Sequence, residues 1–475
     1  MYRSILTYCV LLALPLYGQG RTDSVAEKNR GKSVSINVGL NMVMRGFNRI
    51  ILKDEYAQIN LRSMRTNLKT WPVWDTNRFS TNFIGHPYHG SMYFNSARTN
   101  GLGFYQSSSV SMAGSLMWEY LMETKPPSQN DLWATTIGGT ALGETLFRFS
   151  DLVLDNRTTG LERVGRELLA GILAPTRLIT RLTTGEAWRT GQSRGNFLHV
   201  PSYWLELYFG ETATGTTGSN PSMWRSALGI ELLYGELFET VAGKPYDWFR
   251  LTGEIRAGNN YLHLSQANTL GLMLNKELLH NNETRVTVGL FQHFNYYDLN
   301  GRTNNNTAPV YISEAAAIGP GIIVQKKKDK STVQFAVHLS GIILGASTSD
   351  HFKLEDRDYN FGSGFSLKLS SSLQFKQRLT ISLFSEDYFL FSWKGVDDYE
   401  VLKQLTINEI DFLNVQGDKS STMLNLLGLT MKYSLNKRVH VVLRARSFNR
   451  NTLYTYFSSV KHSLNELFFG ISVNV

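Results

Sequence analysis

Two histidines and a serine lie within one short stretch of this sequence. His86, His89 and Ser91 are separated by only a few residues, and Glu119 and Glu144 follow in segments that we expect to pack nearby. A carboxylate that orients an imidazole can make it a general base for a neighbouring hydroxyl. These five residues are therefore the candidate catalytic set of a hydrolase.

The same side chains are open to two other interpretations. Imidazoles three residues apart, together with carboxylates from neighbouring helices, could bind a divalent metal ion. In a structural interpretation, Glu144 pairs with Arg148 four residues later, and the imidazoles hydrogen-bond helix termini from a His-Pro-Tyr-His-Gly turn. No complete HExxH, GxSxG or phosphate-binding motif decides between the three, so the metal and any cofactor stay unidentified.

The apolar residues around this set recur at helical spacing. The helical period extends from Ser107 to Thr184. Ser128 followed by Asp131 is a variant of the capping box and predicts a helix that runs to about residue 155. A further helix is expected over residues 161–184, with a kink at Pro175.

Three glycines lie in the middle of the second of these helices. Gly138, Gly139 and Gly143 each cost about 1 kcal/mol relative to alanine in a helix interior. Glycines on one helix face allow the backbone of a neighbour to approach closely. We therefore expect this helix to be packed against another helix. Acidic and basic residues are too frequent in all three helices for any of them to span a membrane.

From about residue 196 to residue 475 the pattern changes to a period of two. In the last segment Leu467, Phe469 and Ile471 fall on one face, and Ser472 and Asn474 fall on the other. Such segments are about ten to fifteen residues long, enough to cross a bilayer as tilted strands. The predicted fold class is mainly β: a transmembrane outer-membrane β-barrel of about twelve antiparallel strands with a preceding helical domain. The strands are expected near 197–209, 223–235, 248–257, 262–275, 284–297, 312–325, 332–346, 361–374, 379–393, 421–434, 438–451 and 463–475.

Short and long connections alternate between these strands. Lys326–Ser331 and Phe375–Arg378 are tight, whereas Asp298–Pro309, Ser347–Tyr359 and Lys394–Ser420 are long and polar. Bacterial barrels combine short periplasmic turns with long external loops in this way, and carry aromatic girdles at both interfaces. The expected girdle residues are Trp204, Tyr208, Trp248, Tyr296, Tyr297, Trp393 and Tyr433.

The N-terminus has the pattern of a targeting segment. Residues 1–20 contain Arg3 followed by a short apolar run, which is typical of a secretory signal peptide. Residues 21–70 form a polar segment with a short strand expected near Ser33–Met44. The one cysteine, Cys9, lies in the signal peptide, so we expect neither disulfides nor thiolate metal sites in the mature chain.

Composition and charge agree with an envelope protein. Charged residues make up 18% of the chain, below the ~25% of typical soluble domains, and aromatic residues make up 12%. The net charge of +9 is not concentrated in a nucleic-acid module, and an exported chain is expected to have no nucleic-acid partner. Basic residues at 326–330 and 438–450 either face solvent or meet lipid headgroups and lipopolysaccharide phosphates.

Four stretches of the chain resemble a known family. "IGHPYHGSMYFNSARTNG", "SLMWEY", "PSQNDLWATTIGGTALGE" and "RFSD" look like the signature of the bacterial domain-of-unknown-function family 3943, and "GKPYDWF" further on also fits. The resemblance covers about residues 70–160. This family occurs mainly in the envelopes of Bacteroidetes-like and other Gram-negative bacteria. The resemblance therefore implies placement in the envelope and carries no established activity.

Together these features predict a Gram-negative outer-membrane protein in four parts. They are the signal peptide (1–20), the polar segment (21–70), a helical domain in the periplasm or inside the barrel as a plug (71–190), and the barrel (196–475). The expected function is envelope structure, or binding and passage of a small solute. The expected partners are outer-membrane lipids, with lipopolysaccharide or a small solute. The alternative is a lipid- or lipopolysaccharide-modifying hydrolase, so whether the chain is an enzyme stays open.

Overall fold

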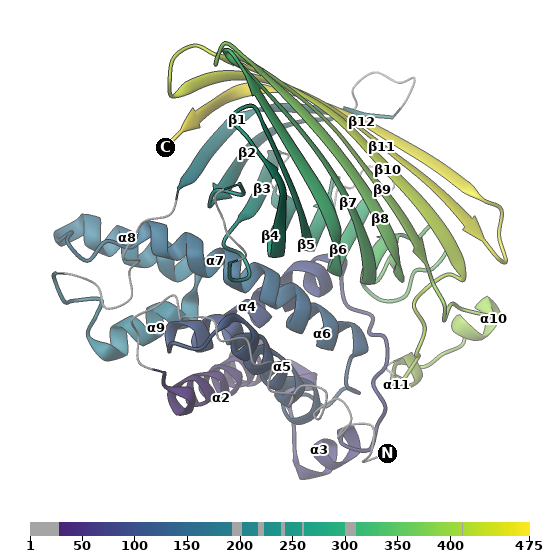
Figure 1. The fold of residues 1–475 in the computed structure, drawn as a ribbon. Coiled ribbons are helices and arrows are strands. Elements are labelled where there is room, and N and C mark those ends of the chain that lie inside the picture. Colours follow the sequence, from purple (N-terminus) through teal and green to yellow (C-terminus); the bar gives the residue numbers. More distant parts are fainter. Residues whose placement is uncertain are drawn as a thin grey trace. The chain divides into compact units, whose positions relative to one another are not determined.

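Strands of the C-terminal half close into one antiparallel barrel (Figure 1). The computed structural model describes residues 28–191, 202–216, 223–238, 243–258, 261–299, 310–410 and 412–475; the predicted signal peptide lies outside them. Within these residues twelve strands pair with their neighbours in sequence, and β1 pairs with β12 to close the ring, which confirms the predicted barrel. The strands are β1 (Tyr203–Gly215), β2 (Met223–Tyr234), β3 (Phe249–Gly258), β4 (Tyr261–His280), β5 (Thr284–Asp298), β6 (Tyr311–Lys328), β7 (Ser331–Thr348), β8 (Tyr359–Phe375), β9 (Leu379–Phe391), β10 (Ser420–Ser434), β11 (Val439–Tyr454) and β12 (Val460–Asn474).

The two faces of the strands differ as their period of two predicts. On β12, Leu467, Phe469 and Ile471 are exposed, while the alternating Glu466 and Phe468 are buried. The same alternation holds on β10. These two strands therefore have an apolar outward face and a mixed, partly charged inward face.

The predicted aromatic girdle is only partly correct. Trp393 and Tyr433 are exposed near strand ends, as expected. Tyr208 is instead half-buried and Tyr297 is buried, and both donate hydrogen bonds to glutamates; Tyr296 is also buried. The sequence places an aromatic residue near a strand end. Because neighbouring side chains point to opposite faces, an error of one residue in the strand register assigns the aromatic ring to the wrong face.

The chain divides into two compact units, and the helices that precede the barrel in sequence belong to the first. Of the described residues, those in 28–75, 84–191 and 403–414 form this unit, and those in 76–83, 202–402 and 415–475 form the barrel unit. None of the described helices is long and apolar enough to span a membrane. The helices are α2 (Arg30–Phe47), α3 (Leu61–Asn67), α4 (His86–Thr99), α5 (Phe104–Leu121), α6 (Gln129–Trp133), α7 (Gly139–Val153), α8 (Gly160–Leu173) and α9 (Pro175–Thr184), with α10 (Tyr399–Leu402) and α11 (Ile407–Ile410) in the connection between β9 and β10.

The predicted short strand at Ser33–Met44 is wrong, because this stretch lies within helix α2. Alternating apolar residues suggested a strand. The actual period is set by Ser33, Asn37 and Asn41, which recur every four residues and are the buried face. The Asn41 amide donates to the backbone carbonyl of Gly114 on α5. The buried polar residues at helical spacing therefore explain why this stretch forms a helix and not a strand.

The other helices largely follow the sequence prediction, with two differences in detail. The hydroxyl of Ser128 accepts a hydrogen bond from the N–H of Asp131 and caps α6, as predicted. A π-helical segment (η4, Ala134–Gly138) joins α6 to α7. Pro175 was expected to kink one helix, but α8 ends at Leu173 and Pro175 begins α9. Proline lacks an N–H and suits a first helical turn better than a helix interior.

The segment Thr76–Phe83 belongs to the barrel unit although it precedes α4. The Phe79 ring packs on Tyr296 and Tyr311, with centroids 5.1 and 4.4 Å away. The Asn82 amide donates to the hydroxyl of Tyr359 over 2.7 Å. Aromatic packing and a buried hydrogen bond therefore fix this segment on strands β5, β6 and β8.

Candidate functional site

His86 is the first residue of helix α4. A π-helical segment (η3, Thr81–Gly85) leads into α4, and Pro87 lies in the first helical turn, where a missing N–H costs little. The structural interpretation expected a turn at this motif, whereas the structure continues it as a helix to Thr99. The start of α4 therefore positions the imidazole of His86.

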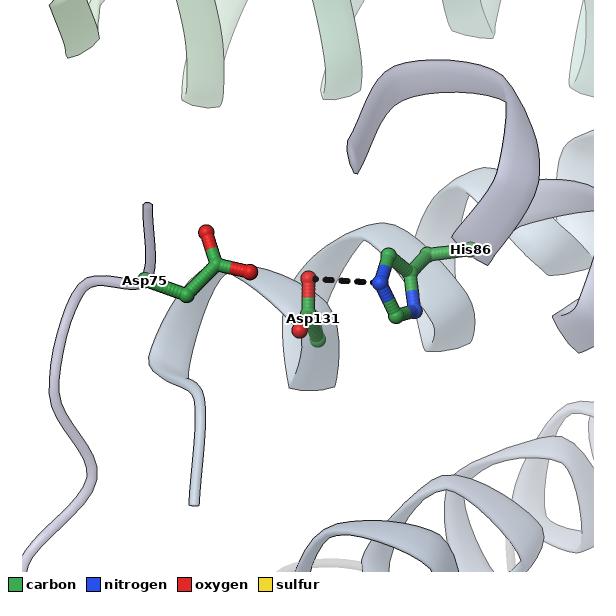
Figure 2. A group of neighbouring side chains, drawn as sticks. All are labelled: Asp75, His86 and Asp131. Atoms are coloured by element: carbon green, nitrogen blue, oxygen red, sulfur yellow. Dashed lines mark ion pairs between the residues drawn. The ribbon is translucent and has the colours of Figure 1, made fainter. Parts of the chain in front are cut away.

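Asp131 faces His86 from the first turn of α6. Its Oδ1 lies 3.3 Å from Nε2 of His86 (Figure 2). The amide of Asn130 donates to the same oxygen over 2.8 Å. Asp131 is buried, and two hydrogen bonds hold it in place. Its backbone N–H donates to the hydroxyl of Ser128, and its carboxylate accepts a hydrogen bond from Asn130.

Asp75 completes a group of three potential metal ligands. A bridge between Val73 and Ser128 brings this segment beside α6. The Asn130 amide donates to Oδ1 of Asp75 over 3.1 Å, and the Asp75 N–H donates to Oδ1 of Asn130. One ligand atom from each of Asp75, His86 and Asp131 lies within 4.8 Å of the others (Figure 2).

Two further carboxyl groups, of Glu119 and Glu123, lie near this group. Glu119 is buried, and its carboxylate accepts the N–H of Ser128 over 2.7 Å. Glu123 accepts a hydrogen bond from the indole N–H of Trp118. Burial and the charges of Asp75, Glu119 and Glu123 raise the pKa of Asp131 well above its ordinary value. Burial, together with repulsion from Glu123 and Asp75, does the same to the pKa of Glu119.

The two histidines are poor bases in this environment. Burial lowers the pKa of His86, and the charge of Asp75 only partly opposes this. Burial, reinforced by His86, lowers the pKa of His89 to about 3. The His89 ring packs against Tyr93 and Trp118. Both imidazoles are therefore neutral near pH 7, the form in which histidine binds metals.

Ser91 and Glu144 have other partners. The hydroxyl of Ser91 donates to the backbone carbonyl of Tyr88 over 2.6 Å. Glu144 is buried between two arginines: Arg98 donates to it over 2.7 and 2.9 Å, and Arg148 over 2.8 Å. The Glu144–Arg148 pair expected by the structural interpretation is thus confirmed. Burial raises the pKa of Glu144, but the two guanidinium groups outweigh it and the net pKa is below the ordinary value.

The structure therefore assembles a different group from the predicted catalytic set. Of that set, His86 lies in the group, and Glu119 is tied to it through the backbone of Ser128. Asp131 was predicted from the sequence as part of the capping box and was not among the five catalytic candidates. Asp75 carried no sequence signal, because its place depends on the long-range pairing of Val73 with Ser128.

Comparisons with known proteins give solved barrel structures and one match to a family model. No curated protein matches the sequence. Among solved structures, the NanC porin is 8% identical with a TM-score of 0.27, covering 57% of this chain and 100% of that chain. The channel DcaP of Acinetobacter baumannii is 10% identical with a TM-score of 0.23, covering 58% and 96%. The KdgM porin is 8% identical with a TM-score of 0.23, covering 57% and 98%. These values are low, and the barrel fold rests on the strand pairing itself.

A family model matches residues 71–176, most of which lie in the helical unit. Residues 71–176 include Asp75, His86, Asp131 and both glutamates near them. This stretch also contains the four sequence fragments that resemble a known family. It matches the family model described as Domain of unknown function (DUF3943).

Proposed function

We propose that this chain is an outer-membrane β-barrel through which a small polar solute passes in a gated manner. The observation that supports it is the opposite character of the two strand faces. An apolar belt surrounds the barrel, and ion pairs fill the inside. Helices or closed barrels are the only structures that satisfy all backbone groups within a bilayer.

The outer face carries large apolar side chains that water would not favour. Phe469 on β12, Leu427 on β10 and Phe209 on β1 are exposed by 62%, 52% and 61%. Soluble proteins rarely expose an apolar surface that continues over many strands. Lipid chains cover such a belt in transmembrane barrels, whose strands need about nine to eleven residues to cross.

A polar row lies on the outer face of strands β9 to β12, between the apolar run toward the short turns and a few exposed apolar residues beyond it, such as Met423 and Phe391. Asp387 pairs in register with Asn425, Asn425 with Asn449, and Asn449 with Ser463. The Asn425 amide donates to Asp387 over 2.7 Å. Between this row and the short turns the outward side chains are mainly apolar, as in the run from Leu427 to Tyr433. The row therefore supports a membrane boundary at this level.

The interior is crossed by a network of arginines and glutamates. Arg256 on β3 lies 2.5 Å from Glu466 on β12 and 2.7 Å from Glu254. Arg446 on β11 donates to Glu466 over 2.6 Å, and Arg444 pairs with Glu254. This network occupies the space between strands that are not neighbours in the sheet. A solute would have to displace these ion pairs, so the network acts as a gate.

Conductance across a planar bilayer tests this function. Removing both members of one pair, Arg446→Ala with Glu466→Ala, avoids leaving an unpaired charge and should raise the conductance several-fold. Asn449→Ala on the outer face is the matched control and should leave conductance unchanged. Heat-modifiable migration on a gel verifies that each barrel is folded. A folded double variant that conducts no better than the wild type would rule out passage and leave a structural role.

The hydrolase alternative has less support from the geometry. Ser91 donates to its own helix backbone, and Glu144 is held by two arginines. Both would have to leave their partners before they could act with His86. We therefore prefer solute passage.

A further inference from the structure

We infer that Asp75, His86 and Asp131 form a binding site for a divalent first-row metal ion such as Zn²⁺. The donor set combines one imidazole nitrogen with two carboxylate oxygens, all within 4.8 Å of one another. Zn–N and Zn–O bonds of about 2.0–2.1 Å imply tetrahedral edges of roughly 3.3 Å. The distance from His86 Nε2 to Asp131 Oδ1 is 3.3 Å, at the long end for a hydrogen bond.

The charges around the site favour a cation. Elsewhere in the helical unit, buried carboxylates are paired with arginines: Glu144 with Arg98 and Arg148, and Glu167 with Arg163 and Arg181. In the described part of the chain, no lysine or arginine forms an ion pair with Asp131 or Glu119. Buried charges are normally paired or bound to a metal, so a divalent ion would supply the missing positive charge.

The surroundings resemble the outer shell of a metal site. Asn130 donates to both Asp75 and Asp131 and so fixes the orientation of two ligands. His89 lies three residues after His86 on α4, so the two imidazoles share a helix face. Its Nε2 is buried, and within the described residues it has no hydrogen-bond partner. Three protein ligands leave a fourth position for water or for an added donor.

Metal content of the full-length protein tests this site. After treatment with a chelator, the detergent-solubilised protein is titrated with Zn²⁺ by calorimetry and its bound metal is measured by mass spectrometry. We expect one ion per chain. His86→Ala and Asp131→Asn should each weaken binding at least tenfold. His280→Ala, at an exposed histidine on β4 that pairs with Glu277, is the matched control and should bind as the wild type does.

Two results would overturn the metal site. One is equal Zn²⁺ affinity in the wild type and in Asp131→Asn, with circular dichroism showing both to be folded. The other is loss of binding in His280→Ala alone. Asp131→Asn is suited to this test because it removes a buried charge from an acidic group and keeps the shape of the side chain, so we expect it to fold.

A separate observation supports a second inference, about the surface of the helical unit. Helix α8 buries Arg163 and Glu167, whereas Leu161, Leu168 and Ile172 are exposed by 90%, 57% and 68%. A helix on the surface of a soluble protein shows the reverse pattern.

Helix α2 has the same inverted pattern. It buries Asn37 and Asn41 and exposes Met42, Val43 and Phe47. Two helices that are distant in sequence thus expose apolar faces to the surroundings. The faces that they bury are polar and, on α8, contain the ion pair of Arg163 and Glu167. Polar groups inside and apolar groups outside are typical of protein that contacts lipid.

We infer that these exposed faces of α2 and α8 lie against phospholipid in the membrane interface. The chain that follows α2 supports lipid rather than protein as the occupant. Ile50, Ile51 and Leu52 are all exposed, and the exposed Arg49 and Lys53 flank them. Apolar residues between basic ones suit the boundary between acyl chains and anionic headgroups. This inference does not depend on passage through the barrel.

The single cysteine of the sequence, Cys9, lies in the predicted signal peptide, which makes a sharp test available. In a Cys9→Ser background, Leu168→Cys and Val43→Cys are labelled with an environment-sensitive fluorophore in full-length protein reconstituted into phosphatidylcholine–phosphatidylglycerol vesicles. We expect blue-shifted emission, and quenching by lipids that carry a quencher on the acyl chain. Glu162→Cys, on the same helix as Leu168, is the matched control and should emit as in water.

Two outcomes would overturn the lipid contact. Water-like emission at both apolar positions would show that these faces are in solvent. Blue-shifted emission without quenching by lipid would assign the faces to contact with protein.

Discussion

Gly90 and Gly139 lie in backbone contact where helix α4 crosses the start of α7. A β-carbon on Gly139 would lie 2.6 Å from the Cα of Gly90, and one on Gly90 would lie 1.8 Å from the carbonyl oxygen of Thr135. No side chain fits between helices at this separation. The crossing lies one helical turn from His86 and holds α4 against the continuous segment from α6 to α7, which carries Asp131.

Gly139→Ala should destabilise the helical unit. The added methyl group would push two backbones apart, and overpacking of this kind costs about 1–3 kcal/mol. Gly165→Ala on α8 is the matched control, because a β-carbon there meets nothing within 4 Å; it should stabilise its helix by about 1 kcal/mol. Hydrogen exchange of the α4 and α7 amides measures the first effect, and that of the α8 amides measures the second. Equal protection of the α4 and α7 amides in the two variants would contradict the close crossing.

Glu144→Gln should be among the most damaging single changes in this unit. Glu144 is the shared partner of Arg98 and Arg148, and all three side chains are buried. Removing one member of a buried ion pair costs about 3–5 kcal/mol, because charge is left uncompensated. Glu162→Gln, which breaks a pair with Arg166 on the surface of α8, should cost less than about 1 kcal/mol. Hydrogen exchange can compare the loss of stability in the two variants. Similar losses would show that the buried pairs of Glu144 contribute no more than a surface ion pair.

The barrel could be predicted from the sequence far better than the helical unit. Its strands show a period of two because one face meets an apolar environment over many residues, as on β12. In α2 the same apolar residues surround a buried polar face, so alternation appeared where the real period is close to four. Prediction of an element from its apolar residues assumes that these residues face inward, and this assumption fails in α2.

The site was predictable only in part, for a related reason. His86 is conspicuous as a residue type, and Asp131 through its capping position. Asp75 has no local signal, because its proximity depends on a bridge between Val73 and Ser128, which are far apart in sequence. Ser91 was a plausible nucleophile by spacing, yet its helical position directs the hydroxyl to the carbonyl of Tyr88. Contacts formed over long sequence distances therefore separate the predicted group from the one that the structure assembles.

Glu123 should make the helical unit less stable as pH rises. Burial raises its pKa to about 7, with Asp75 adding to this shift and the Trp118 indole and Lys125 opposing it. A raised pKa means that the folded state binds the proton more tightly than the unfolded state. Its contribution is complete below about pH 4.5 and is lost as pH rises through about 7.

Glu123→Gln tests this dependence. Glutamine can still accept the indole hydrogen bond but cannot ionise, so we expect a flatter profile of unfolding midpoint between pH 5 and 8. The difference between the variant and the wild type isolates Glu123 from other titrating groups, including His86 and Glu119. Parallel profiles for the two proteins would show that Glu123 ionises normally in the folded state.

Ile471→Arg should impair insertion of the barrel far more than Asn449→Arg. Both side chains point outward, but Ile471 lies within the apolar belt and Asn449 in the polar row beside Asn425 and Ser463. Arginine on the lipid face of a barrel costs about 2–4 kcal/mol at the bilayer midplane and about 0–1 near the interface. The yield of heat-modifiable barrel after refolding into vesicles measures the difference. Equal yields would place both positions at the same depth, so the polar row would no longer mark the edge of the membrane and the charged interior would have to be reassigned to a soluble barrel.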